Sequence, residues 1–105
     1  MSRIDQLLKL VKLEPGDPLS HYGVGLERIN LEQWDQAAEA FGEAIACDPN
    51  YSAAYYHKGR AEGQAGRADD ARLTLARGLE VAAASGDRKT EAEMRDLLDS
   101  LGQAG

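Results

Sequence analysis

The sequence predicts an all-α protein in which about six antiparallel helices form a helix-turn-helix solenoid, that is, an α-α superhelix. Three observations support this prediction. Alanine and leucine supply most apolar residues of the 105-residue chain, phenylalanine and β-branched residues are scarce, and only three prolines interrupt it. Short breaks containing proline, glycine and aspartate separate the helical stretches. Shifting the sequence against itself by 34 positions aligns similar residues, and this length is typical of a helix-turn-helix repeat.

The internal period extends over most of the chain. Gly25 aligns with Gly59, and Tyr22 aligns with Tyr56. Further aligned pairs are Ala37 with Ala71, Phe41 with Leu75, Ile45 with Leu79, and Pro15 with Pro49. Small residues that recur at fixed positions predict close helix contacts, and the large apolar residues predict the side chains that fill the space beside them.

The helix boundaries follow from local signals in chain order. Asp17 and Pro18 predict a helix start, because the carboxylate can accept free N–H groups and proline at the first helical position loses no hydrogen bond. Asp48-Pro49-Asn50 predicts a helix end, since proline cannot continue the backbone ladder. Gly66 and the break at Ser85-Gly86-Asp87 predict the next two ends. The predicted helical elements span residues 1–15, 18–31, 34–47, 52–65, 68–84 and 87–102.

Charge and cysteine content exclude several classes of function. The net charge of −6 argues against binding to nucleic acid or to an anionic membrane surface, because both require a basic patch. No apolar run is long enough for a membrane span, and the first residues carry charges among the leucines instead of a signal-peptide pattern. The single cysteine, Cys47, cannot form an internal disulfide, which favours a cytoplasmic location.

Residues with catalytic chemistry are few. Cys47, His21 and His57 are types that supply a nucleophile and a base, but no third orienting group or oxyanion-binding group accompanies them. Acidic pairs such as Asp69-Asp70 have the pattern of exposed turn residues, not of metal ligands. The glycines nearest to a phosphate-loop pattern lie inside a predicted helix. The sequence therefore predicts no enzyme activity, no cofactor and no metal.

The repeating residues resemble the tetratricopeptide repeat (TPR) family, in the form of a small bacterial protein with two complete repeats plus flanking helices. The family pattern is met in the first unit by His21, Val24, Gly25, Trp34, Ala37, Phe41, Ala44, Ile45 and Pro49, and in the second by Tyr55, Gly59, Gly66, Asp69, Asp70, Ala71 and Leu75. It is not met at Lys58, Gly78 and Ala83, and Arg28 and Glu62 replace the tyrosine of the pattern.

The resemblance implies one TPR domain over residues 1–105. Its parts are a half-repeat helix at 1–15, repeat one at 18–51, repeat two at 52–85 and a capping helix at 87–102. In the last helix, Met94, Leu97, Leu98 and Leu101 recur at helical spacing and form one apolar stripe. Arrays of this kind end with a helix whose other face is polar.

The resemblance also implies a binding groove along the inner helices of the repeats. The family positions that face this groove correspond to Leu19, Tyr22, Leu26, Ile29 and Asn30 in the first unit, and to Ala53, Tyr56, Arg60, Gly63 and Gln64 in the second, with His57 beside Tyr56. Packing between neighbouring inner helices is the alternative role for Tyr22, Leu26 and Ile29. The lysine and asparagine with which some family members grip chaperone C-termini are replaced here by Tyr22 and Leu26.

These observations predict an adaptor or scaffold that binds a protein or peptide segment in the groove and performs no chemistry. Tyrosine and arginine are common anchors at protein interfaces. The alternative is a self-assembling module, because a second copy could bury the apolar residues of either terminal helix, such as Ile4, Leu7, Leu8 and Val11.

Overall fold

The computed structural model describes residues 1–103 and is helical, with no strand in that part of the chain. The all-α prediction of about six helices is thus confirmed. The last two residues of the predicted 1–105 domain lie outside the described residues. The helices are α1 (Arg3–Leu13), α2 (Pro18–Asn30), α3 (Trp34–Cys47), α4 (Ser52–Gln64), α5 (Ala68–Ser85) and α6 (Arg88–Gln103). Each boundary lies within two residues of its predicted position.

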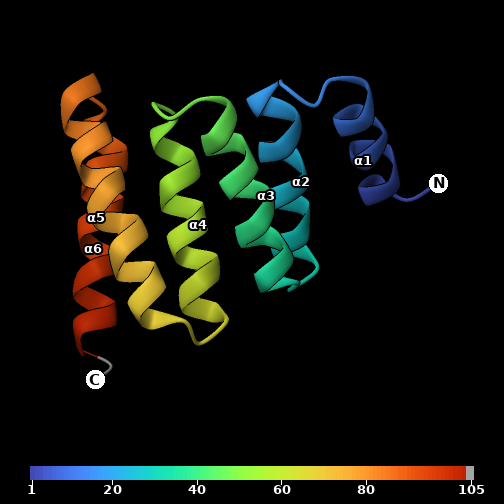
Figure 1. Cartoon of the computed structure of the whole chain (residues 1–105). Helices are drawn as coiled ribbons and strands as arrows, with labels where there is room; N and C mark the ends of the chain where they lie inside the picture. Colours follow the sequence, from blue (N-terminus) through green and yellow to red (C-terminus); the bar gives the residue numbers. More distant parts are fainter. Residues whose placement is uncertain (104–105) are drawn as a thin grey trace.

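Consecutive helices run antiparallel and pack side by side in a slab of 41 × 28 × 18 Å (Figure 1). α1 contacts α2 alone, whereas α6 packs on both α5 and α4 at the other end. As a result α1 is the least covered helix: it has no buried residue. No helix of the described residues combines the length and the apolar character that crossing a membrane requires.

Local chemistry explains where the helices begin and end. The Asp17 carboxylate accepts a hydrogen bond from the Leu19 amide at 2.9 Å and caps α2, and Pro18 occupies the first helical turn. After α4 and α5 the chain turns through left-handed glycines, Gly66 with φ 81° and Gly86 with φ 75°. The turn after α2 places a left-handed residue at the position one repeat before Gly66, but there it is Glu32, with φ 57°.

Glycine and alanine allow the two helices of each unit to approach closely, as predicted. A Cβ added to Gly25 would lie 2.6 Å from the Phe41 ring, and one added to Gly59 would lie 2.6 Å from the Leu75 side chain. Phe41 and Leu75 are fully buried, as are Ala37 and Ala71. The two units therefore share one packing scheme with different fillers.

Candidate functional site

The helices form two layers. α4 packs against both α2 and α6, whereas α3 and α5 pack on these three helices without contacting each other (Figure 1). We call the exposed side of the α2, α4 and α6 layer the inner face, and the side that carries α3 and α5 the outer face. The predicted groove belongs to the inner face.

A cluster of rings lies where α2 meets α4. The rings of Tyr22 and Tyr51 stack with centroids 4.9 Å apart, and Tyr22 meets Phe41 edge-on at 5.6 Å. The His57 ring stacks on Phe41 with centroids 5.5 Å apart. It is T-shaped to Tyr22 and Tyr56, with centroid distances of 5.7 and 5.0 Å. We call these five residues the ring cluster. It connects the Phe41 core to half-buried tyrosines that also have exposed atoms.

His57 occupies the centre of the ring cluster and is neutral at neutral pH. Burial, followed by the positive charge of Arg60, lowers the pKa of His57 to about 4. Its Nδ1 atom is buried and has no hydrogen-bond partner among the described residues. Burial also raises the pKa of Tyr22, and the carboxylate of Glu93 raises it further. Glu93 belongs to α6, so this helix adds an acidic group near Tyr22.

The structure separates the predicted groove residues of α2 by exposure. Leu19 and Leu26 are exposed by 66% and 36%, so both present apolar surface on the inner face. Asn30 is exposed and donates a hydrogen bond to the Glu27 carboxylate at 3.1 Å. Ile29 is only 8% exposed and packs in the core beside Phe41 and Ala61. The place of Ile29 in the predicted groove is therefore corrected: its side chain packs between helices, the alternative role described above.

The predicted groove residues of α4 also differ in exposure. Arg60 and Gln64 are exposed, whereas Ala53 and Gly63 are half-buried. A Cβ added to Gly63 would lie 3.3 Å from Leu101 of α6, so this position is close to the terminal helix. Tyr56 packs against the second core cluster, which contains Leu75 and Met94.

Two residues near the predicted groove were not predicted. Tyr51 aligns with Asp17 in the 34-residue period, so the repeat indicated no aromatic residue there. Glu93 falls on Gly59 in the same alignment, and nothing in the period marks it as a neighbour of Tyr22. The position of Glu93 depends on how α6 docks on α4 and α5, which the period does not describe.

The outer face contains an ion pair between a half-buried lysine and a buried carboxylate, at positions where the sequence departs from the TPR pattern. The Glu62 carboxylate is 2% exposed and lies 2.9 Å from Lys58 Nζ. Thr74 Oγ1 donates to Glu62 Oε1 at 2.6 Å and accepts from Lys58 at 3.3 Å. Arg67 approaches the same carboxylate at 3.8 Å. We call Lys58, Glu62 and Thr74 the polar triad; its groups satisfy one another, as buried charges require.

The candidate catalytic residues have other partners. His21 Nε2 donates to the Pro15 carbonyl at 2.7 Å, and Cys47 Sγ lies 3.6 Å from the same oxygen. His57 lies in the ring cluster. In residues 1–103, no group of three or more His, Cys, Asp or Glu side chains is arranged to hold a metal ion.

Comparisons with known proteins agree with this geometry. Residues 29–90 match the tetratricopeptide repeat family. A TPR repeat-containing protein of Pseudomonas aeruginosa is 32% identical over 101 residues, which cover 96% of each chain. The tetratricopeptide repeat domain protein of Salinibacter ruber superposes with a TM-score of 0.77 at 31% identity, covering 85% of this chain and 99% of that one.

The TPR2B domain of yeast Sti1, solved in complex with pHsp70, has the same fold. It superposes with a TM-score of 0.91 at 20% identity, covering 97% of this chain and 82% of that domain. Sequence and structure thus agree over nearly the whole length of the chain, and the protein belongs to the tetratricopeptide repeat family.

Proposed function

We propose that this chain is an adaptor or scaffold that binds an extended segment of another protein on its inner face and performs no catalysis. The observation that carries the proposal is the ring cluster, flanked on α2 by the exposed side chains of Leu19 and Leu26. We place the module in the cytoplasm, because its lone Cys47 suits a reducing compartment. The division into repeat one (18–51), repeat two (52–85) and flanking helices is part of the same proposal.

The chemistry of the inner face suits an apolar segment with an acidic group near one end. Half-buried tyrosines offer large, rigid contact area at low entropic cost, because they are already held by their neighbours. Arg60 lies one helical turn beyond Tyr56 and is exposed, so it can pair with a carboxylate or a backbone carbonyl. The charge of Glu93 acts on Tyr22, so a segment with several acidic groups is disfavoured on this face.

The segment differs from a chaperone C-terminus. The relative from yeast was solved with pHsp70, and the TPR clamp for chaperone tails uses a lysine and an asparagine. Tyr22 and Leu26 stand at those two positions here. Neither side chain can donate the charged or amide hydrogen bonds that hold a terminal carboxylate, so we expect a chaperone tail peptide to bind poorly.

Capture of the partner from the source cell, followed by affinity measurements on inner-face variants, tests this proposal. Changing Tyr22, Tyr56 and Arg60 together to alanine should weaken binding by about 2 kcal/mol or more. Because both tyrosines touch the core, the helical circular dichroism and the melting temperature of the variant must be measured as well. A second variant, Leu19→Ser with Arg60→Glu, alters only exposed side chains and should weaken binding without a change in stability.

The matched control is the pair Glu39→Gln and Glu43→Gln on the outer face, which should leave inner-face binding within about threefold. Normal binding by both inner-face variants would contradict the proposal. Loss of binding in the outer-face control alone would show that this partner uses the other face.

Self-association through α1 is the second candidate, and the exposure of its leucines favours it. Leu10 and Leu13 are 47% and 77% exposed, although the residue one repeat after Leu10, Ala44, is fully buried. Leu7 instead packs on α2 beside Gly23. A second copy could cover the Leu10 and Leu13 face. Sedimentation at several concentrations tests this: a monomer at every concentration, or a dimer that survives Leu10→Lys with Leu13→Lys, would contradict it.

A further inference from the structure

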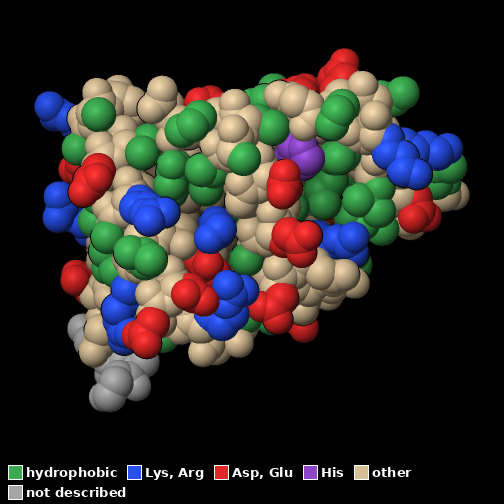
Figure 2. Space-filling model, in the orientation of Figure 1, with side chains coloured by type: hydrophobic (Ala, Val, Ile, Leu, Met, Phe, Trp, Pro, Cys, Tyr) green, Lys and Arg blue, Asp and Glu red, His purple; other side chains and the backbone are tan. Residues whose placement is uncertain are grey.

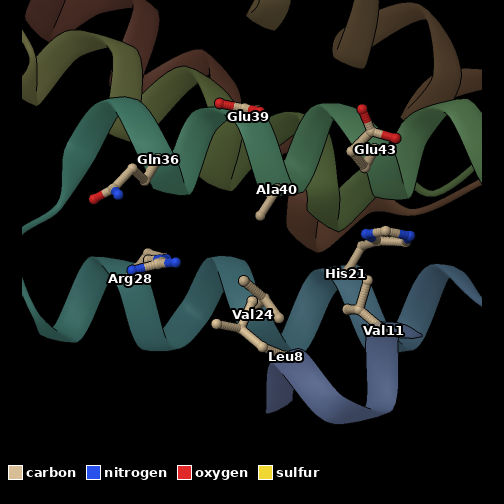
Figure 3. A pocket seen from close by; sticks show the side chains of 9 residues that line it. All are labelled: Leu8, Val11, His21, Val24, Arg28, Gln36, Glu39, Ala40 and Glu43. Carbon is tan, nitrogen blue, oxygen red and sulfur yellow. The ribbon is translucent and has the colours of Figure 1, made fainter. Parts of the chain in front are cut away.

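A pocket on the outer face lies between α1, α2 and α3, away from the ring cluster. Its volume is about 370 Å³, within the range of small ligand sites. The floor is apolar and consists of Leu8, Val11, Val24 and Ala40. Figure 3 shows these side chains between α1 and α2 below and α3 above. We call this site the outer pocket.

The wall that α3 contributes to the outer pocket is acidic. Glu39 and Glu43 are exposed, lie one helical turn apart and line the pocket. Neither forms an ion pair with another described residue. Figure 2 shows Asp and Glu side chains over α3 and hydrophobic side chains in the space between α3 and α1. The pocket therefore combines unpaired carboxylates with apolar surface.

His21 adds an acceptor of fixed orientation to the outer pocket. Its side chain is 9% exposed and extends from α2 toward Glu43 (Figure 3). The Pro15 carbonyl can only accept, so the 2.7 Å contact requires the proton on Nε2. In the neutral ring Nδ1 is then an acceptor, and no hydrogen bond joins it to another described residue. The pocket thus presents three acceptors, His21 Nδ1 and the carboxylates of Glu39 and Glu43. Arg28 and Gln36 also line it, at the end away from His21 in Figure 3, where the Arg28 guanidinium donates to Gln33 Oε1 at 2.7 Å.

We propose that the outer pocket binds a lysine or arginine side chain from an amphipathic segment of a partner protein, whose neighbouring aliphatic side chain lies on the apolar floor. A lysine or arginine head donates hydrogen bonds and accepts none, so it matches the two carboxylates and His21 Nδ1, which outnumber the one cation of the lining, Arg28. Residues 18–50 also carry six acidic side chains and one basic one, which attracts a basic segment and repels an acidic one. The site is separate from the inner face and would let the chain hold two partners.

The equivalent site one repeat later serves as an internal contrast. It is lined by Gly42, Ile45, Tyr55, Lys58, Thr74 and Arg77, each 34 positions after a residue of the outer pocket. Its volume is about 170 Å³. Lys58 replaces Val24, and Arg77 replaces Glu43. Two cations and no carboxylate line that site, whereas one cation, Arg28, and two carboxylates line the outer pocket, so the proposed binding belongs to the first unit alone.

The test is an NMR titration of the full ¹⁵N-labelled chain at physiological salt. The probes are three capped helical peptides that alternate leucine and alanine with lysine, with glutamine, or with glutamate. The lysine peptide should shift the amides of Leu8, Val24 and Glu43 and the His21 Nδ1 resonance, and the glutamate peptide should shift none of them. Glu39→Gln with Glu43→Gln should weaken the lysine peptide by about tenfold, as the loss of two charged contacts predicts.

The matched control, Glu80→Gln with Asp96→Asn, makes the same change of net charge at exposed positions of α5 and α6. It should weaken the lysine peptide by less than about twofold, because distant exposed charges are screened. Equal weakening by both pairs would reduce the effect to general charge attraction and overturn the proposal. Shifts confined to Tyr22 and Tyr56, or no shifts with the lysine peptide near millimolar concentration, would overturn it as well.

Discussion

The outer faces of the two repeats are formed by equivalent helices but carry side chains of different charge. In the first unit Val24, Ala40 and Glu43 line an open pocket of about 370 Å³. In the second unit Lys58 and Thr74 stand at the positions of Val24 and Ala40, and the pocket measures about 170 Å³. One solenoid geometry therefore supports an apolar pocket edged by two carboxylates in one unit and an ion pair with a buried carboxylate in the next.

This difference separates the positions at which the helices pack closely from the positions that set the chemistry of the surface. A Cβ added to Gly25 or Gly59 would lie 2.6 Å from the large apolar side chain that packs there, so neither position can change freely. Val24 and Lys58 occupy the adjacent position in the pattern, and the structure accommodates both because Glu62 accompanies the lysine. Packing between the helices of a repeat constrains the small residues. The side chain one position away can differ between repeats when its neighbours differ with it, as Lys58 and Glu62 do.

The largest expected loss of stability comes from substitutions that test whether the two units pack in the same way. Ala37→Asp and Ala71→Asp each place an unpaired charge at a fully buried helix contact, so each should cost more than about 3 kcal/mol. Urea unfolding measures both losses. The exposed Ala76→Asp is the control for helix propensity and should cost well under about 1 kcal/mol. Unchanged stability in one of the two buried variants would break the equivalence of the units.

The next effect concerns the polar triad, which the first unit lacks. Lys58→Met leaves the Glu62 carboxylate buried without its lysine and should cost about 3 kcal/mol. Lys58→Met together with Glu62→Met replaces the pair by flexible apolar chains and should restore stability to within about 1 kcal/mol. A double-mutant cycle from urea unfolding checks the coupling. If the two single losses simply add, the ion pair is not a coupled unit.

A smaller effect concerns pH and His57, which has Gly23 as its counterpart in the first unit. The folded pKa of about 4 lies below the value of roughly 6.5 expected in an unfolded chain. Between these values the unfolded state binds a proton that the folded state does not, so stability should fall as pH drops from 6.5 to 4.

Because the His57 ring is half-buried, we expect the unmodified protein to lose about 2 kcal/mol more folding stability on acidification than His57→Phe does. The phenylalanine ring cannot titrate. Urea unfolding of both proteins at pH 7 and pH 4.5 measures the difference, and the shared titration of the carboxylates cancels. Parallel losses in the two proteins would mean that His57 takes up its proton as readily in the folded state.

The smallest effect compares the turns after α2 and α4. Glu32 and Gly66 occupy equivalent positions and both have positive φ, 57° and 81°. Because an L side chain is strained there, Glu32→Gly should stabilise by about 0.5 kcal/mol and Gly66→Ala should destabilise by about 1 kcal/mol. Thermal melts of the two variants check the opposite signs. Shifts of the same sign would show that the two turns are not equivalent.

The sequence alone determined the helices and their order. The 34-residue period, the Asp17-Pro18 start and the Asp48-Pro49-Asn50 break placed each helix boundary within two residues. These features are local, because a cap or a proline acts on the backbone hydrogen bonds next to it. The small residues Gly25 and Gly59 likewise predict close helix contacts, because a Cβ at either position would lie 2.6 Å from the Phe41 or Leu75 side chain.

Tertiary structure decided what each surface residue contacts. Ile29 and Leu26 are both apolar and three positions apart on one helix, yet the docking of α3 and α4 buries the first and leaves the second exposed. The charge of Glu93 acts on Tyr22 because α6 docks on α4, which brings residues far apart in the sequence into one region. Burial of Glu62 beside Lys58 depends in the same way on Thr74 of α5. Side-chain burial is set by all helices packed around a position, and that information is absent from any single repeat.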